Sequence, residues 1–149
     1  MKSPEENKTA LENSILGLDV GLKRVGVAIS RNNVKTPVPY TTLSFKDSDK
    51  QILKLIHSEK ISVVVIGLPL SETNTLTDQA LSILKYARRI KRRSSVELSF
   101  VDEYASSKEA QERLSIFGGD IDSLSAAIIL ERFFSGQIIK EDLTSYLSL

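Results

Sequence analysis

The chain has 149 residues, of which 41% are hydrophobic and 26% are charged, and its formal net charge is +1. These values are typical of one soluble globular domain that buries its own core. The sequence contains no cysteine and a single histidine, His57. Thiol nucleophiles and cysteine-based zinc sites are therefore excluded, and histidine-dependent catalysis is nearly excluded. Any acid–base or metal chemistry must depend on carboxylates.

We expect one domain at residues 14–136, with a separate segment at each end. Residues 1–13 are polar and lack the apolar stretch of a secretory signal, so we expect a flexible N-terminal segment there. Residues 137–149 are expected to form a C-terminal tail. No apolar run reaches the roughly 18 residues of a membrane span, and the absence of cysteine fits a reducing compartment. We therefore expect a cytoplasmic protein that does not bind membranes.

The domain is expected to begin with two strands. Residues 15–21 form a short aliphatic run with a carboxylate, Asp19, in its middle, and residues 23–30 form a second aliphatic run. An ionised carboxylate in an apolar strand is unfavourable unless a cation or a metal pairs with it. Asp19 is therefore a candidate site residue, and the neighbouring Lys23 and Arg24 are candidate phosphate ligands.

The rest of the domain is expected to alternate between strands and helices. The continuous β-branched run at 61–66 is typical of a strand buried on both faces, and apolar residues at helical spacing predict helices before and after it. The other expected elements are a strand at 40–45, a helix at 47–59, a helix at 75–93, a strand at 96–101, and helices at 106–117 and 121–134.

The order of these elements predicts the sheet. Short connections allow the first three strands to be antiparallel, whereas two helical crossovers require parallel strands. The expected fold class is therefore α/β, with a mixed sheet of about five strands and helices on both faces. In such a sheet the first and last strands lie near one another, with the fourth strand between them.

Three acidic positions lie in or at the ends of expected elements: Asp19, the pair Asp102 and Glu103, and Asp122. If their side chains converge, they suit Mg²⁺ or Mn²⁺, which prefer oxygen ligands and assist phosphoryl displacement without histidine or cysteine. A structural role stays open for each position. Asp19 would pair with a cation of the adjoining turn, the acidic pair would be solvated, and Asp122 would cap or complement a helix dipole, although Asp120 is the better cap.

The cations gather in two places, the turn between the first two expected strands and the second half of the helix expected at 75–93. In that helix they either form a solvated face favoured by the helix dipole or hold nucleic-acid phosphates. The candidate nucleic-acid-binding residues are Lys23, Arg24, Arg88, Arg89, Arg92 and Arg93.

Four sequence blocks carry a resemblance to a known family. They are GLDVGLKRVGVA at 17–28, GLPL at 67–70, the acidic pair with the following SS and EA at 102–110, and DSLSAAIIL at 122–130. Over about residues 16–134 the chain resembles the YqgF/RuvX family of RNase H-like proteins, described as pre-16S ribosomal RNA nucleases or Holliday-junction-resolvase-like proteins. The first block alone also resembles ATP-binding proteins of the sugar-kinase type, but those need a second lobe that 149 residues do not provide.

The resemblance implies an RNase H-like nuclease domain in which Asp19, Glu103 and Asp122 are catalytic residues and ligands of Mg²⁺ or Mn²⁺. It implies hydrolysis of phosphodiester bonds in structured nucleic acid, foremost at the 5′ end of pre-16S rRNA in ribosome biogenesis. The alternatives are a Holliday junction resolvase acting on branched DNA, for which a homodimer is expected, and a nucleic-acid-binding module with weakened catalysis. Tyr104 motivates the last alternative, because the family has an arginine there and tyrosine cannot hold a phosphate bidentately.

Overall fold

The computed structural model describes residues 13–32, 34–71, 73, 75–103, 106–117, 119–140 and 142–147, so the N-terminal segment expected at 1–13 lies outside it except for Asn13. The strands are β1 (Ser14–Val20), β2 (Arg24–Ser30), β3 (Val38–Ser44), β4 (Ile61–Leu68) and β5 (Glu97–Asp102). The helices are α2 (Ser48–Ser58), α3 (Asp78–Arg92), α4 (Ser106–Phe117), α5 (Ile121–Phe134) and α6 (Thr144–Leu147).

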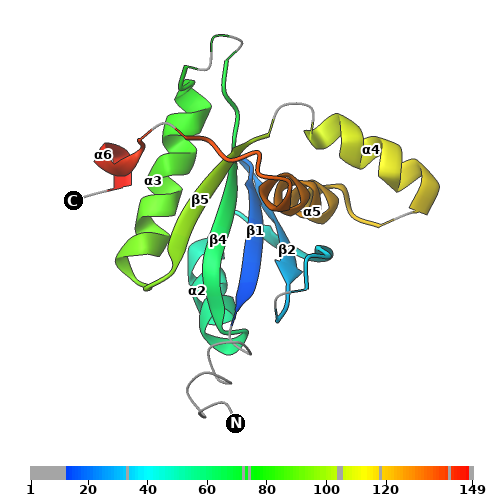
Figure 1. Ribbon diagram of the computed structural model, residues 1–149, viewed down its shortest axis with the longest axis horizontal. Helices are drawn as coiled ribbons and strands as arrows, with labels where there is room; N and C mark the ends of the chain where they lie inside the picture. The colour runs from blue at the N-terminus through cyan, green and yellow to red at the C-terminus, as the bar shows by residue number, and fades with distance from the viewer. Residues whose placement is uncertain are drawn as a thin grey trace.

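The strands form one five-stranded mixed sheet in the order β3-β2-β1-β4-β5 (Figure 1). β1 pairs antiparallel with β2, and β2 pairs antiparallel with β3. β4 lies parallel to both β1 and β5. Helices α2 and α3 make the connections into β4 and β5. The α/β fold predicted from the sequence is confirmed, including the position of β4 between the first and last strands.

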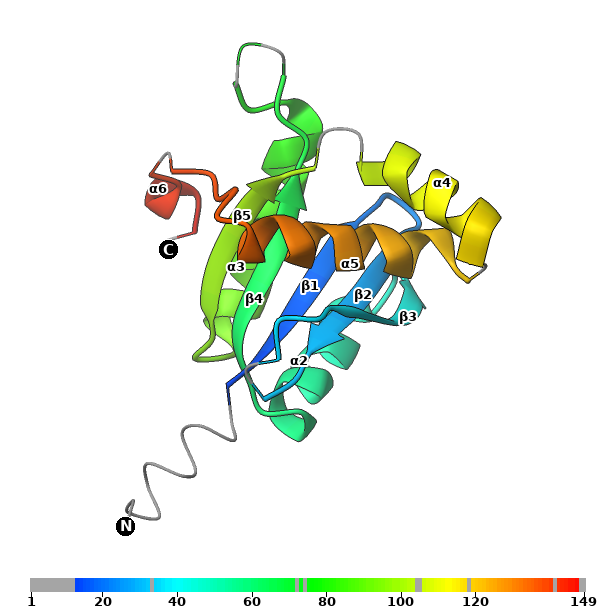
Figure 2. The ribbon, with the colours of Figure 1, turned by 45° about the vertical axis from the view of Figure 1, so that its right-hand side comes forward.

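Helices cover both faces of the sheet, but the apolar clusters on the two faces differ in size and in the side chains that they contain. Helices α2 and α3 pack on one face, and α5 crosses the other (Figure 2). The α2/α3 face carries the larger apolar cluster, which includes Leu18, Ile66 and Leu84. The cluster beneath α5 is smaller and includes small side chains such as Ala28 and Ala126.

Two glycines let α5 lie very close to the sheet. A Cβ atom at Gly17 would lie 2.5 Å from Leu130 Cγ, and one at Gly26 would lie 1.9 Å from the backbone oxygen of Asp122. A glycine inside a strand commonly marks such a close approach. Any side chain at Gly26 would therefore push the first turn of α5 away from β2.

Three element boundaries differ from the sequence predictions by two or more residues. β3 begins two residues early, at Val38, and includes a proline, which is tolerated because β3 is an edge strand. β4 continues to Leu68 because its last residues still pair with β5. α3 begins at Asp78 because Thr77 is its N-cap, with a side chain that accepts a hydrogen bond from Ala80 N at 3.1 Å.

The C-terminal tail packs along the outer edge of β5. Ile138 forms an antiparallel bridge with Val101, and Ile139 N donates a hydrogen bond to Phe100 O at 2.8 Å. The tail then forms α6, which lies beside α3 (Figure 1). Within the described residues, every helix is too short or too polar to cross a membrane.

Candidate active site

Asp19 lies near the end of β1, on the face covered by α5. Side chains alternate along a strand, so Asp19 shares this face with Gly17, which packs against α5. Its partner across the β1–β2 pair is Gly26. Because Gly26 has no side chain, the first turn of α5 comes down beside Asp19.

Glu103 follows directly after β5 and reaches back across β4 toward β1. Its backbone nitrogen donates to Leu68 O at 3.1 Å, which extends the β4–β5 pairing past the end of the strand. Gly67 provides the room for its side chain, because a Cβ atom there would lie 3.0 Å from Glu103 Oε2. The carboxyl groups of Glu103 and Asp19 are hydrogen-bonded to one another.

Two carboxyl groups in contact cannot both ionise without a large electrostatic penalty. Burial, together with the charge of Asp19, raises the pKa of Glu103 to about 8, so the pair holds one proton at neutral pH. Burial raises the pKa of Asp19 as well; the hydrogen bond from Glu103 opposes this shift, and the charge of Asp122 adds to it. The pair therefore shares a proton, which reduces its negative charge in the absence of a bound cation.

Asp122 stands in the first turn of α5 but does not cap the helix. The cap is Asp120, whose side chain accepts a hydrogen bond from Ser123 N at 3.1 Å. Asp122 Oδ2 accepts a hydrogen bond from Arg24 Nε at 2.8 Å. Arg24 belongs to the turn whose cations were considered as structural partners of Asp19, but in the structure its side chain pairs with Asp122.

The three predicted acids lie at one corner of the fold, where β1 and β5 end and α5 begins. They do not form a preformed metal cage: in the part of the chain that the structure describes, no three carboxylate or imidazole side chains are placed to hold one ion. Asp122 is engaged with Arg24, and Asp19 is engaged with Glu103. A cation bound at this corner would replace these contacts.

The candidate phosphate ligands fall into two separate groups. Lys23 and Arg24 are exposed beside the acids. Helix α3 starts where β4 ends and runs back along the sheet, so its last turns lie at the other end of the sheet, on the face opposite Asp19 (Figure 1). The arginines of those turns are Arg88, Arg89, Arg92 and Arg93. The fold thus places Lys23 and Arg24 beside the acids, whereas the arginines of α3 lie at the other end of the sheet.

The sequence predictions missed the residues that support the acids. Gly26 and Gly67 make room for them, and a glycine within an apolar strand is the signal that could have identified both. Arg132 was also missed, although its Nη1 donates to the carbonyl oxygen of Asp102 at 2.8 Å. A cation in the last turn of a helix is common, so no local pattern distinguishes it. Tyr104, the departure from the family pattern, lies outside the described residues.

Comparison with known proteins identifies the family. A model of the RuvX family, described as Holliday junction resolvase, matches residues 13–136. A protein of Endomicrobium trichonymphae named "Putative pre-16S rRNA nuclease" is 34% identical over 137 residues, which cover 84% of this chain and 97% of that protein. A protein of Gloeothece citriformis with the same name is 37% identical over 128 residues, which cover 79% of this chain and 85% of that protein.

The fold is shared with a solved structure of RuvC. The structure of T. thermophilus RuvC in complex with Holliday junction substrate matches with a TM-score of 0.55 at 11% sequence identity, over 85% of this chain and 98% of that chain. This likeness confirms the expected RNase H-like fold. Since the family model spans β1 to α5 and the relatives match over most of their length, the chain belongs to the RuvX family.

Proposed function

We propose that this protein is a metal-dependent nuclease that hydrolyses phosphodiester bonds in structured nucleic acid. The proposal is carried by the hydrogen-bonded pair Asp19 and Glu103, which lies close enough to a third acid, Asp122, for that charge to raise the pKa of Asp19. Gathered acids with raised pKa values destabilise a fold unless a cation joins them, and such groups are concentrated at functional sites. The family membership of the chain points to the same activity.

The donor set at this corner fits Mg²⁺ or Mn²⁺. Asp19, Glu103 and Asp122 all offer carboxylate oxygens, which these ions prefer, and we propose that the three side chains hold the metal. When bound, the ion would neutralise developing charge on the phosphate and lower the pKa of water. The contribution of the chain is to hold the carboxylates on rigid elements and to release the proton shared by Asp19 and Glu103.

Lys23 and Arg24 are the proposed phosphate contacts beside the acids. The side chain of Arg24 is 60% exposed although its Nε bonds Asp122 at 2.8 Å. Arginine binds phosphate oxygens as readily as carboxylate oxygens. The guanidinium group can therefore transfer to a substrate phosphate, which leaves Asp122 available to a cation.

The arginines at the end of α3 are proposed to contact the same nucleic acid at a distance. Helix α3 has 15 residues and therefore spans about 22 Å at about 1.5 Å per residue. A substrate that touches both the acids and these arginines must extend at least about as far from the cleavage point, and it must pass from one face of the sheet to the other. This geometry favours a structured nucleic acid bound through its phosphates, with affinity that falls as salt rises.

The substrate that we propose is the 5′ end of pre-16S rRNA, processed during ribosome biogenesis in the cytoplasm. Its support is the name shared by the relatives from Endomicrobium trichonymphae and Gloeothece citriformis. The family description favours a second candidate, a four-way DNA junction. Cutting such a junction symmetrically requires two active sites, so this candidate includes a homodimer. Cleavage of each substrate with Mg²⁺, combined with sedimentation velocity of the free protein, separates the two.

The metal assignment is tested by neutral variants of the acids. Asp19→Asn and Glu103→Gln should abolish cleavage of a pre-16S 5′ leader RNA with Mg²⁺ while the protein stays folded, and EDTA should abolish cleavage by the wild type. Glu112→Gln, an exposed acid on α4, is the control and should cleave normally. Unchanged cleavage by Asp19→Asn would contradict the assignment.

The alternative of a binding module rests on Tyr104. It is favoured if the wild type binds both substrates without metal and cleaves neither, and if Tyr104→Arg gains Mg²⁺-dependent cleavage. Cleavage by the wild type removes this alternative.

A further inference from the structure

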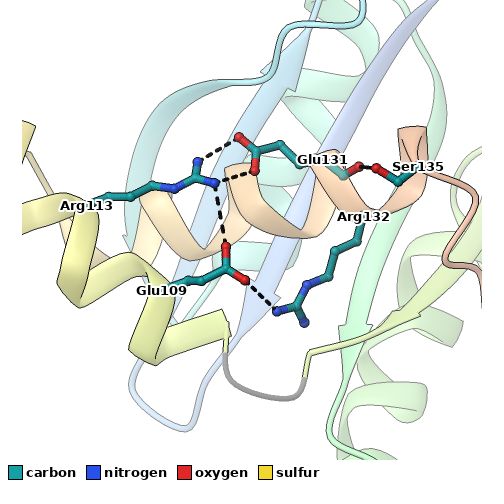
Figure 3. Close-up of polar contacts among 5 residues, drawn as sticks. All are labelled: Glu109, Arg113, Glu131, Arg132 and Ser135. Carbon is teal, nitrogen blue, oxygen red and sulfur yellow. Dashed lines mark hydrogen bonds and ion pairs between the residues drawn. The ribbon is translucent and has the colours of Figure 1, made fainter.

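Arg132 contacts the chain on both sides of Glu103. Its Nη1 donates to the carbonyl oxygen of Asp102 at 2.8 Å, and Asp102 directly precedes Glu103. Its Nη2 donates to Glu109 Oε1 at 3.3 Å (Figure 3). Glu109 lies in the first turn of α4, which follows Glu103 along the chain. One guanidinium group thus spans the segment that carries Glu103.

The contact with Asp102 completes the hydrogen bonding of β5. Glu103 N donates inward to Leu68 O of β4. Because the C=O and N–H of one trans peptide point in opposite directions, the carbonyl of Asp102 points to the outer edge. Earlier on that edge, Phe100 O accepts a hydrogen bond from the C-terminal tail at 2.8 Å. Arg132 therefore supplies the next hydrogen bond on this edge, after the one from the tail. The peptide between Asp102 and Glu103 is bonded to β4 on one side and to Arg132 on the other.

Arg132 connects this peptide to a rigid helix. Its side chain is only 14% exposed, and it belongs to α5, which packs tightly on the sheet at Gly17 and Gly26. The same helix carries Asp122 in its first turn. The end of β5 and the first turn of α5, which hold two of the three acids, are thereby fixed to one element.

A neighbouring ion pair provides a natural control. Arg113 of α4 donates from Nη1 and Nη2 to the two carboxylate oxygens of Glu131 on α5, each at 2.7 Å (Figure 3). Arg113 Nη2 also lies 3.6 Å from Glu109 Oε2. Arg113 thus joins α4 to α5 as Arg132 does, but these contacts hold the two helices and not the end of β5.

We propose that Arg132 is a positioning residue, which holds the end of β5 against α5 so that Glu103 keeps the same place when its contact with Asp19 opens for a cation. The inference rests on the proposed function, because that function makes Glu103 a metal ligand. A cation that merely complements the carboxyl end of α5 needs one positive charge. Positioning uses two donor nitrogens held in one rigid plane and aimed at Asp102 and Glu109, whereas lysine has a single donor nitrogen on a flexible stem.

The test compares Arg132→Lys with Arg113→Lys. Arg132→Lys keeps the charge but replaces two donor nitrogens in a rigid plane with one on a flexible stem. With the pre-16S 5′ leader RNA and Mg²⁺, its kcat should fall roughly 10–100-fold, while KM stays within about twofold because the groups proposed to contact RNA are unchanged. Its affinity for Mn²⁺, measured by calorimetry without RNA, should fall by a similar factor. Arg113→Lys should match the wild type in kcat and Mn²⁺ affinity.

A readout without metal separates this proposal from the proposed function. Amide hydrogen exchange of a peptide that contains Asp102 and Glu103 should be faster in Arg132→Lys than in Arg113→Lys, whether or not the protein cleaves RNA. Unchanged exchange there, or wild-type kcat and Mn²⁺ affinity in Arg132→Lys, overturns the positioning role. Equal losses in both variants also overturn it, since the cause is then the contact between α4 and α5. A wild type that binds no Mn²⁺ and cleaves no RNA overturns the proposed function instead.

Discussion

The two faces of the sheet are built from the same strands but differ in character, since one carries the larger apolar cluster and the other carries the acids. Leu18 and Asp19 are consecutive residues of β1 and point to opposite faces. Leu18 is completely buried in the apolar cluster under α2 and α3, whereas Asp19 meets Glu103 and Asp122 beside α5. One face stabilises the fold by excluding water, and the other gathers charge that disfavours the fold. Changes on the apolar face are therefore expected to lower stability and leave the site unaltered, whereas removing an acid from the other face is expected to raise stability and abolish cleavage.

The largest expected effect on stability is on the α2/α3 face. Leu18→Ala removes a fully buried side chain and should lower the free energy of unfolding by about 2–5 kcal/mol, because it leaves a cavity in a packed core. Urea titration measures the loss. The folded fraction should keep its affinity for Mn²⁺, and a change in that affinity would break the separation between the two faces.

A smaller effect of opposite sign is expected at Glu103. Glu103→Gln removes the need for Glu103 to take up a proton on folding at pH 7, because its pKa rises to about 8 in the folded protein. The variant should therefore raise the free energy of unfolding by roughly 1–3 kcal/mol at pH 7 without divalent cations. Urea titration with EDTA measures the gain, and Glu112→Gln, which is exposed, should change stability by less than about 0.5 kcal/mol. A Glu103→Gln variant that is less stable than the wild type contradicts the electrostatic account.

The same proton uptake predicts how stability varies with pH. The pKa of Glu103 rises from 4.5 to about 8 on folding, so between these values the folded protein keeps a proton that the unfolded chain releases. This contribution is complete below the lower value and is lost as pH rises through the higher one. Without divalent cations, the wild type should therefore lose stability from about pH 5 to about pH 8 relative to Glu103→Gln. Parallel pH profiles of the two proteins would rule this out.

The smallest effect is expected at the far end of α3. Arg89 Nε lies 3.6 Å from Asp49 Oδ2, and its side chain is 48% exposed. Because exposed ion pairs contribute little, Arg89→Gln should change the free energy of unfolding by less than about 0.5 kcal/mol. If Arg89 contacts a phosphate, the slope of log affinity against log salt for RNA binding should fall by about one in magnitude. An unchanged slope removes Arg89 from the proposed surface.

Much of the fold could be predicted because periodicity and turn residues are local signals. Asp19 was also predictable, since a carboxylate inside an aliphatic run is visible in the sequence. The partners of the acids were not, because they depend on contacts between distant residues. The pair Arg24 and Asp122 joins positions 98 residues apart, and the contact between Asp19 and Glu103 depends on Gly67 lying between them in space.

The arginines of α3 show a second limit of sequence reasoning. Their spacing predicted a basic helix end, and the structure has one. Its distance from the acids follows from topology, because a helix that connects two parallel strands must return to the opposite end of the sheet. The direction of α3 relative to the acids follows from the order of the strands and helices and not from the residues of the helix itself.

Calorimetric titration of the wild type and Asp19→Asn with Mn²⁺ at pH 7, in two buffers of different ionisation enthalpy, tests most directly whether the acids gather to hold a cation. Metal ligands must lose their protons on binding. The wild type should therefore bind Mn²⁺ and release about one proton per ion, which is the proton shared by Asp19 and Glu103, and Asp19→Asn should bind at least tenfold more weakly. Equal binding by the two proteins, or binding without proton release, would contradict the account.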